Sequence, residues 1–154
     1  MNKYISFIPI ILGLAVSSFV KITFSNNLIQ TVKTYGYIDK GDSIEFRFGD
    51  QKKIQVGLLN IDLDKRRNEI KKVNLAGDFN GWNPNNANYA LKKIDEKNFS
   101  LVISKKSIGQ KGETHTFKFV LNNVYWIEPP YDAINKITGK DHNTNLFLKL
   151  TSVR

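Results

Sequence analysis

Short stretches in which apolar and polar residues alternate limit what this chain can fold into more than any other feature of its sequence. Residues 43–48 and 54–58 both show this alternation, and the turn-forming sequence Gly-Asp-Gln at 49–51 separates them. A period of two places every second side chain on one face of a β-strand, whereas an amphipathic helix needs a period near 3.6. No amphipathic stretch of three helical turns follows residue 25. The pattern predicts an all-β fold in which 43–48 and 54–58 form a first hairpin.

The same alternation continues through the second half of the chain. Further strands are expected at 73–76, 98–104, 116–121, 124–127 and 145–150. In the third of these, Phe117, Phe119 and Leu121 fall on one face and should point into the core. Lys118 should therefore project from the opposite face. The strongly charged stretch 62–72 is expected to form a loop or at most one helical turn, and many short strands separated by turns are typical of a β-sandwich.

The first 25 residues have the features of a secretory signal. Lys3 precedes an apolar run at 5–20 that only Ser, Pro and Gly interrupt. These sixteen residues fall short of the roughly 20 that a membrane-spanning helix needs, and Pro9 would interrupt such a helix. A cleaved signal at 1–25 is the first interpretation, and a membrane anchor formed by 5–20 or a buried helix are the alternatives. A signal or an anchor would place the rest of the chain in the periplasm, the cell envelope or the extracellular space.

The composition excludes several functional classes. A length of 154 residues allows one domain with a proper core. Cysteine is absent, which excludes a disulfide framework, a thiol nucleophile and a cysteine-based metal site. His115 and His142 lie too far apart in sequence to suggest a zinc site. No metal and no cofactor is therefore expected.

The net charge of +9 does not by itself indicate a nucleic-acid partner. The lysines are scattered along the chain, and acidic residues dilute the densest basic stretch, at 65–72. This stretch also lacks the interleaved aromatic side chains on which bases stack. A solvated basic surface is the simpler interpretation, and no nucleic-acid partner is expected.

A turn motif follows the strand predicted at 73–76. Gly77 is expected to let the chain leave that strand through a backbone conformation that other residues resist. Asp78 and Asn80 should hydrogen-bond their own backbone and so hold the turn. Phe79 should point back into the core between the sheets.

Two tryptophans are candidates for a binding site. The polar sequence at 83–86 would leave Trp82 near the tip of a loop. Because a sugar ring has an apolar face and a rim of hydroxyls, it binds a flat aromatic platform that is surrounded by hydrogen-bonding groups. Trp82 and Trp126 could supply such platforms, Lys118 could donate hydrogen bonds, and Asn145 could both donate and accept them.

Three segments in a fixed order resemble a known family. They are VNLAGDFNGWNP at 73–84, HTFKFVLNNVYW at 115–126 and NLFLKL at 145–150. This order is similar to that of the family 48 carbohydrate-binding modules. The family includes the early-set domains of glycogen-branching and debranching enzymes and of the glycogen-binding β-subunit of AMP-activated kinase. The resemblance covers about half of the chain.

The resemblance implies a domain organisation and a function. It implies an immunoglobulin-like (early-set) β-sandwich over 73–151, with N-terminal strands and a charged loop at 26–72 joined to it, and with the signal or anchor at 1–25 before them. It also implies a non-catalytic module, not an enzyme, that binds an α-1,4-glucan such as glycogen or a maltodextrin.

The resemblance also implies which residues touch the ligand. In glycogen-binding members, the positions that match Trp82, Trp126, Lys118 and Asn145 contact the glucan. A shift of two residues in the closing strand would select Asn143 in place of Asn145. The family also inserts a hydrophobic residue into the bound glucose just before this asparagine, whereas this chain has the polar sequence Gly-Lys-Asp-His at 139–142.

Each of these residues has a structural alternative. In many enzyme-attached members of the family, the residue that matches Trp82 packs against the catalytic domain. Trp126 could be half-buried packing, and Lys118 could be an ordinary solvated lysine. For the whole chain, the alternative is an interaction domain that docks on a protein partner such as a glucan-acting enzyme, and the polar segment at 139–142 favours it.

Overall fold

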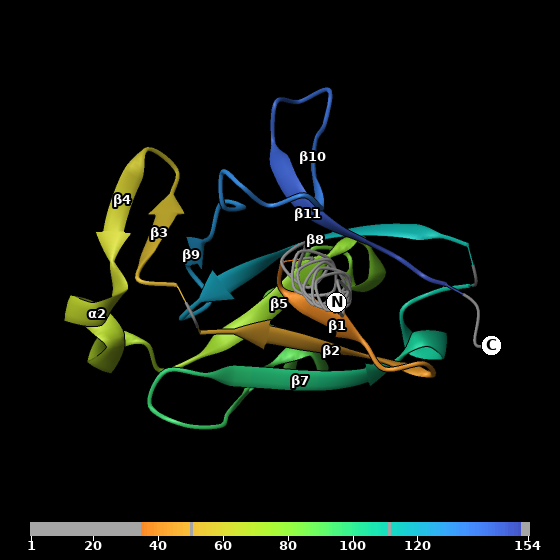
Figure 1. Cartoon of the computed structure of the whole chain (residues 1–154), viewed down its shortest axis with the longest axis horizontal. Helices are drawn as coiled ribbons and strands as arrows, with labels where there is room; N and C mark the ends of the chain where they lie inside the picture. Colours follow the sequence, from red (N-terminus) through yellow and green to blue (C-terminus); the bar gives the residue numbers. More distant parts are fainter. Residues whose placement is uncertain (1–34, 50, 111, 152–154) are drawn as a thin grey trace, which may run out of the picture. The chain divides into compact units, whose positions relative to one another are not determined.

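Antiparallel strand pairs build the fold of this chain (Figure 1). The computed structural model describes residues 35–49, 51–110 and 112–151. The candidate signal or anchor at 1–25 and the beginning of the 26–72 segment lie outside these residues. Within the described part, no helix is long and apolar enough to cross a membrane.

Two sheets and a separate hairpin contain the strands of the described residues. The first sheet holds, in spatial order, β1 (Tyr37–Asp39), β2 (Ser43–Phe48), β7 (Phe99–Ser104) and β6 (Lys92–Lys93). The second holds β10 (Lys136–Thr138), β11 (Thr144–Lys149), β8 (Thr114–Leu121) and β5 (Val73–Gly77), with β9 (Tyr125–Trp126) also paired to β8. The hairpin joins β3 (Lys53–Val56) to β4 (Leu59–Asp62).

Among residues 35–49, 51–110 and 112–151, helical structure is confined to short segments between the strands. They are α2 (Leu63–Arg66) and the 3-10 turns η1 (Arg67–Glu69), η2 (Asp78–Asn80), η3 (Ala87–Tyr89) and η4 (Lys105–Ser107). The prediction of an all-β fold is confirmed. The prediction of at most one α-helical turn at 62–72 is also confirmed, because α2 is four residues long and ends in the 3-10 turn η1.

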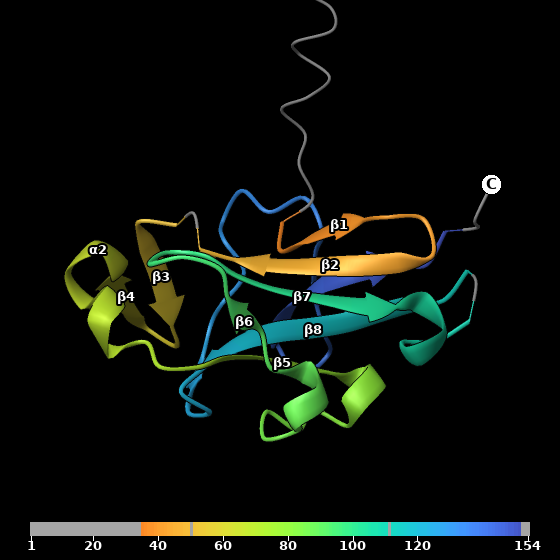
Figure 2. The ribbon, with the colours of Figure 1, turned by 90° about the horizontal axis from the view of Figure 1, so that it is seen from below.

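The strands β2 and β7 lie over β8 and β5 (Figure 2). Aromatic side chains from both sheets meet in one hydrophobic core. The rings of Phe46 in β2 and Phe117 in β8 lie edge to face, with centroids 5.2 Å apart. The rings of Phe48 and Phe119 also meet between the sheets, with centroids 5.3 Å apart and planes inclined by 52°. Aromatic pairs in such geometry contribute about 0.5–1.5 kcal/mol beyond the effect of area burial. Leu121 is buried as well, so the predicted inward face of 116–121 is confirmed.

The predicted first hairpin is wrong. The strand at 43–48, β2, pairs with β1 and β7, and it makes no pair with β3. β3 instead turns back at once through Gly57 and Leu58 to pair with β4. Gly57 has a φ of +56°, the left-handed conformation that two-residue hairpin turns favour. Leu58, which was expected to share an apolar face, is 96% exposed at the tip of this turn.

The strands predicted in the second half of the chain are present as β5, β7, β8, β9 and β11. β2, from the first half, pairs with β7 along six residues from Ser43–Ser104 to Phe48–Phe99. The side chains of β2 at 44, 46 and 48 are buried in the same core as those of β5 and β8. Residues 43–48 therefore belong to the same packed unit as the segment at 73–151.

A charged cluster on the outward side of β2 stabilises the first sheet. The Oε2 atom of Glu45 lies 2.8 Å from Nη2 of Arg47 and 3.1 Å from Nζ of Lys40. The hydroxyl of Ser100 on β7 donates to the other carboxylate oxygen at 3.0 Å. The hydrogen bond from Arg47, followed by those from Lys40 and Ser100, lowers the pKa of Glu45 to about 2.

The Glu45→Gln variant tests this cluster, because its loss in the free energy of unfolding should depend on pH. A carboxyl pKa that is lower in the folded state stabilises the protein above the unfolded value of 4.5 and ceases to do so as the pH falls toward 2. Because Arg47 and Lys40 are about half exposed, we expect a loss of about 1 kcal/mol in the free energy of unfolding at pH 7. Urea denaturation should show this loss shrinking by at least half at pH 3.

The exposed Glu96 offers a matched control, because it makes no ion pair within the described part of the chain. Glu96→Gln should change the free energy of unfolding little at either pH. An equal loss for Glu45→Gln at pH 7 and pH 3 would contradict the role assigned to the cluster.

Candidate functional site

A pocket of about 440 Å³ lies on the side of the second sheet that faces away from the core. Its lining contains all five binding residues selected from the sequence, which are Trp82, Lys118, Trp126, Asn143 and Asn145. Two carboxylates, those of Glu128 and Asp141, complete the lining. The structure thus brings together residues from four separate segments of the chain.

Trp82 reaches the pocket from a turn with an unusual backbone. It follows η2 and the left-handed Gly81, and Trp82 itself has a φ of +57°. Bulky residues rarely adopt this conformation, so the surrounding structure must hold it. The backbone N–H of Trp82 donates to the carbonyl of Gly77 at 2.8 Å, which closes the turn.

Trp126 reaches the pocket from a tight hairpin. Asn122, Asn123 and Val124 connect β8 to β9, and the two asparagines adopt left-handed φ values of +52° and +62°. The N–H of Val124 donates to the carbonyl of Leu121 at 3.0 Å, which closes the turn. The indole rings of Trp126 and Trp82 have centroids 6.4 Å apart and planes inclined by 35°. Both tryptophans are half-buried, so each can present part of its ring to a ligand.

Asn80 holds the turn that carries Trp82, as predicted. Its Oδ1 atom accepts a hydrogen bond from the N–H of Gly77 at 3.0 Å, and its Nδ2 atom donates to the carbonyl of Leu75 at 3.1 Å. Phe79 packs against the core as expected, with its ring stacked on that of Tyr89 at 5.3 Å.

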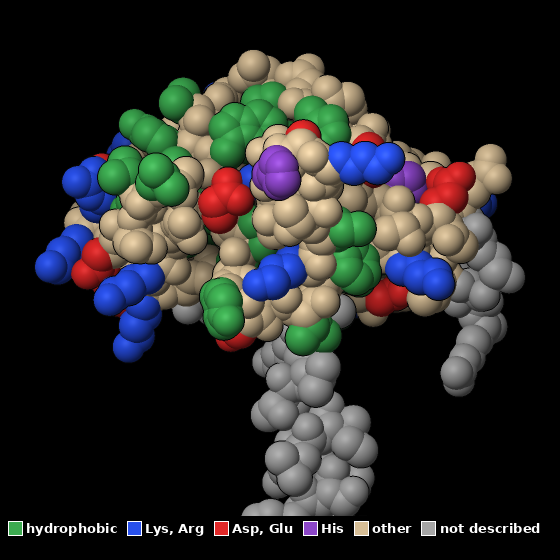
Figure 3. Space-filling view, turned by 90° about the horizontal axis from the view of Figure 1, so that it is seen from above, with side chains coloured by type: hydrophobic (Ala, Val, Ile, Leu, Met, Phe, Trp, Pro, Cys, Tyr) green, Lys and Arg blue, Asp and Glu red, His purple; other side chains and the backbone are tan. Residues whose placement is uncertain are grey.

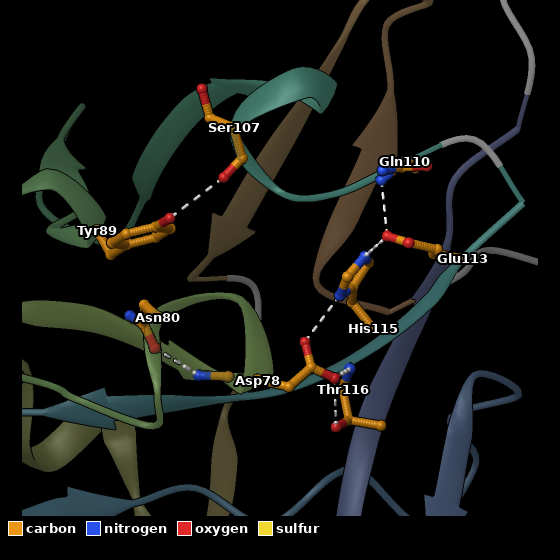
Figure 4. A network of polar contacts seen from close by, with 9 residues as sticks. Asp78, Asn80, Tyr89, Ser107, Gln110, Glu113, His115 and Thr116 are labelled. Carbon is orange, nitrogen blue, oxygen red and sulfur yellow. Dashed lines mark hydrogen bonds and ion pairs between the residues drawn. The ribbon is translucent and has the colours of Figure 1, made fainter.

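Asp78 has a different role from the one predicted (Figure 4). It does not bond its own backbone but reaches across to β8, where its Oδ2 atom accepts from the N–H of Thr116 at 2.8 Å and from the Thr116 hydroxyl at 3.1 Å. Its Oδ1 atom lies 2.8 Å from Nδ1 of His115. The other ring nitrogen of His115 lies 3.2 Å from Glu113. Asp78 therefore ties the turn to the start of β8.

Gly77 is also needed for a reason other than the one predicted. Its φ of −162° is ordinary extended backbone, so no special conformation requires glycine there. A Cβ atom at this position would lie 2.6 Å from the carbonyl oxygen of Thr116 and 2.8 Å from the ring of Phe79. Glycine is required because β8 and the Phe79 ring approach the backbone closely.

Lys118 and Glu128 form an ion pair in the pocket. Lys118 projects from β8 on the side opposite the core, as predicted, but it is only 6% exposed, so the alternative of a solvated lysine is wrong. Its Nζ atom lies 2.7 Å from Oε1 of Glu128. The N–H of Glu128 donates to the carbonyl of Gln55 at 2.8 Å, which ties this segment to β3.

Glu128 was not selected from the sequence, although a signal existed. Glu128 follows Trp126 by two residues, and in an extended segment such residues point to the same side. A candidate platform at 126 therefore implied a neighbouring carboxylate at 128.

The loop between β10 and β11 supplies the polar rim of the pocket. Asn143 donates to Asp141 twice, from its backbone N–H at 3.1 Å and from its side-chain amide at 2.7 Å. These hydrogen bonds lower the pKa of Asp141, with the side-chain bond as the larger cause. Asn145, on β11, makes no side-chain hydrogen bond to another described residue. Asn145 can therefore both donate to and accept from a ligand.

The pocket lining combines apolar and hydrogen-bonding surfaces. Two indole rings offer apolar surface, and amide and carboxylate groups around them offer hydrogen bonds. No group of three or more His, Asp or Glu side chains among residues 35–49, 51–110 and 112–151 is placed to hold a metal ion. The pocket combines the features expected where a hydroxyl-rich ring binds.

No protein-family model matches this chain, and no curated protein matches it either.

Replacing Asp78 with alanine should destabilise the turn below the pocket. The change removes the acceptor for the backbone N–H of Thr116, and the loss of such a hydrogen bond at a solvent-accessible position costs about 0.5–1.5 kcal/mol. Urea denaturation should show a loss in this range. The matched control is Asp132→Ala, because Asp132 is exposed and makes no ion pair with another described residue. Equal unfolding midpoints for the two variants would contradict the anchoring role.

Proposed function

We propose that this chain binds an α-1,4-glucan, such as glycogen or a maltodextrin, without catalysing a reaction. One observation carries the proposal, namely that the indole rings of Trp82 and Trp126 lie 6.4 Å apart in one pocket with amide and carboxylate groups. Each ring can stack on the apolar face of a sugar unit, and the polar groups can bond to its hydroxyls.

The relative tilt of the two indole planes favours a curved ligand. The planes are inclined by 35° and are therefore not coplanar. An α-1,4-linked chain coils and turns successive sugar faces relative to one another, whereas a β-1,4-linked chain is extended and flat. A tilted pair of platforms therefore complements the α-linked polymer better.

The polar residues have separate roles in the proposed site. Asn145 offers the ligand an amide that is free of other side-chain bonds in the described structure, and Asn143 is engaged by Asp141. Lys118 contributes mainly by holding Glu128 in place, because its ammonium is largely buried against that carboxylate. Glu128 and Asp141 can accept hydrogen bonds from sugar hydroxyls.

The proposal extends to the family and the location of the protein. The order of the segments at 73–84, 115–126 and 145–150 supports an early-set, immunoglobulin-like sandwich of the family 48 carbohydrate-binding modules. The packing of two antiparallel sheets around one core is compatible with that assignment. The apolar run at 5–20 supports export, as a secreted or membrane-anchored protein.

A second candidate function is docking on a protein partner such as a glucan-acting enzyme. The observation that favours it is the tip of the β3–β4 hairpin, where Leu58 is 96% and Leu59 is 68% exposed. Adjacent exposed leucines are typical of surfaces that bind other proteins. This function would not require any glucan affinity.

Affinity electrophoresis separates the two candidates. In gels that contain glycogen or amylose, the wild-type protein should be retarded relative to gels without polysaccharide. Trp82→Ala and Trp126→Ala should each weaken binding at least tenfold, which corresponds to about 1.4 kcal/mol, because each change removes a stacking surface. A gel that contains a soluble β-1,4-glucan should retard the protein less.

Tyr131→Ala is the matched aromatic control, since Tyr131 is 95% exposed and does not line the pocket. This variant should migrate like the wild type in every gel. Unchanged retardation of both tryptophan variants would show that the glucan site is wrongly placed. A folded wild-type protein that no glucan retards would favour the docking function.

A further inference from the structure

The pocket and the whole chain carry charges of opposite sign. The chain has a net charge of +9, and its Lys and Arg side chains gather most densely at the end that contains α2, β3 and β4 (Figure 3). The charged residues of the pocket are one lysine and two carboxylates, Lys118, Glu128 and Asp141. The lining therefore has a formal charge of −1 within a basic protein.

The lysine of the pocket is not available to neutralise a charged ligand. Its Nζ atom lies 2.7 Å from the carboxylate of Glu128, and only 7% of its side chain is exposed. Drawing Lys118 toward an anionic ligand would leave Glu128 without its counter-ion. The charges of Lys118 and Glu128 thus neutralise each other, and the pair presents little positive charge to the pocket.

Asp141 is the charged residue of the pocket lining that has no ion-pair partner among the described residues. Its carboxylate accepts two hydrogen bonds from Asn143, and no Lys or Arg among the described residues lies within ion-pair distance of it. These bonds lower its pKa, so Asp141 is ionised at neutral pH. Its oxygens can accept hydrogen bonds from neutral hydroxyls, whereas a second anion beside them would be repelled.

We propose that the pocket selects uncharged sugar units and excludes units that carry a carboxylate or a phosphate, and that Asp141 determines this selectivity. The inference rests on the proposed glucan binding and adds the charge class of the ligand. The net charge of the chain alone would instead predict a preference for anionic polymers. Asp141 is exposed at the rim, where it can touch the ligand. At physiological salt the Debye length is about 8 Å, so the attraction of distant basic residues is screened more strongly than the repulsion between Asp141 and an anion in contact with it.

The two tryptophans allow this pocket to be observed separately from the rest of the surface. The chain contains two tryptophans in all, and both line the pocket. Their fluorescence therefore reports ligand binding in the pocket, and it should not respond to a polyanion that binds at the basic end of the molecule. A fluorescence titration of the full chain thus measures selectivity at the site itself.

The experiment compares three ligands of equal length in 0.15 M NaCl: maltoheptaose, the same oligosaccharide oxidised to carboxylates at C6, and the methyl ester of the oxidised form. Wild-type protein should bind maltoheptaose at least tenfold more tightly than the carboxylate form. The neutral ester controls for size, and it should bind at least threefold more tightly than the carboxylate.

Asp141→Asn should reduce the difference in affinity between maltoheptaose and the carboxylate form to less than threefold. An asparagine can still accept the N–H of Asn143, so the loop keeps one of its two bonds. Raising NaCl from 0.05 to 0.5 M should reduce this difference in affinity for the wild type. The same change should have little effect on the difference measured with Asp141→Asn. Asp132→Asn, a change of the same type outside the pocket, should leave the difference as large as in the wild type.

The possible failures are distinguishable. If wild-type protein binds the neutral and the carboxylate oligosaccharides equally, or prefers the carboxylate, the selectivity is wrong while glucan binding holds. If Asp141→Asn leaves the difference in affinity unchanged, Asp141 does not determine the selectivity. If maltoheptaose does not bind at all, the proposed function fails and the inference fails with it.

Discussion

The edge-to-face contact between Phe46 and Phe117 joins the two sheets, and the position of the pocket depends on it. Because Phe117 and Phe119 point into the core, the pleat of β8 places Lys118 on the opposite side of the sheet. That side would be solvated in a simple two-layer protein. Here the segments that follow β5 and β8 fold back over it, which buries Lys118 and creates the pocket.

The pocket is held in place mainly by polar contacts that cross between segments. Asp78 fastens the turn after β5 to Thr116, and Asn80 closes the same turn on itself. These bonds allow Trp82 to adopt a left-handed backbone that a bulky residue would otherwise avoid. On the other side, Lys118 holds Glu128. Both tryptophans are therefore attached to structure that is already ordered without a ligand, which reduces the entropy lost on binding.

Charge is arranged locally in a way that the overall composition does not reveal. The chain is basic, yet the pocket has more carboxylates than cations. Net charge governs solubility and long-range attraction, whereas the groups within contact distance of a ligand govern what fits. For this reason the composition of the whole chain is a poor guide to the chemistry of its binding site.

Local periodicity in the sequence determined the all-β fold and the inward face of β8, because alternation specifies which side of a strand a residue occupies. The five pocket residues named from the sequence were selected by side-chain chemistry and by the resemblance to the family 48 modules, and Glu128 and Asp141 were not among them. Periodicity could not determine which strands are neighbours, so the hairpin expected between 43–48 and 54–58 was wrong. The partners of Asp78, His115 and Thr116, lie 37 and 38 residues away in sequence. The partner of Lys118, Glu128, lies across a hairpin. Such pairings arise only when the sheets pack, because packing brings distant segments within hydrogen-bond distance. Tertiary structure alone therefore decided how the turn is anchored and what charge the pocket presents.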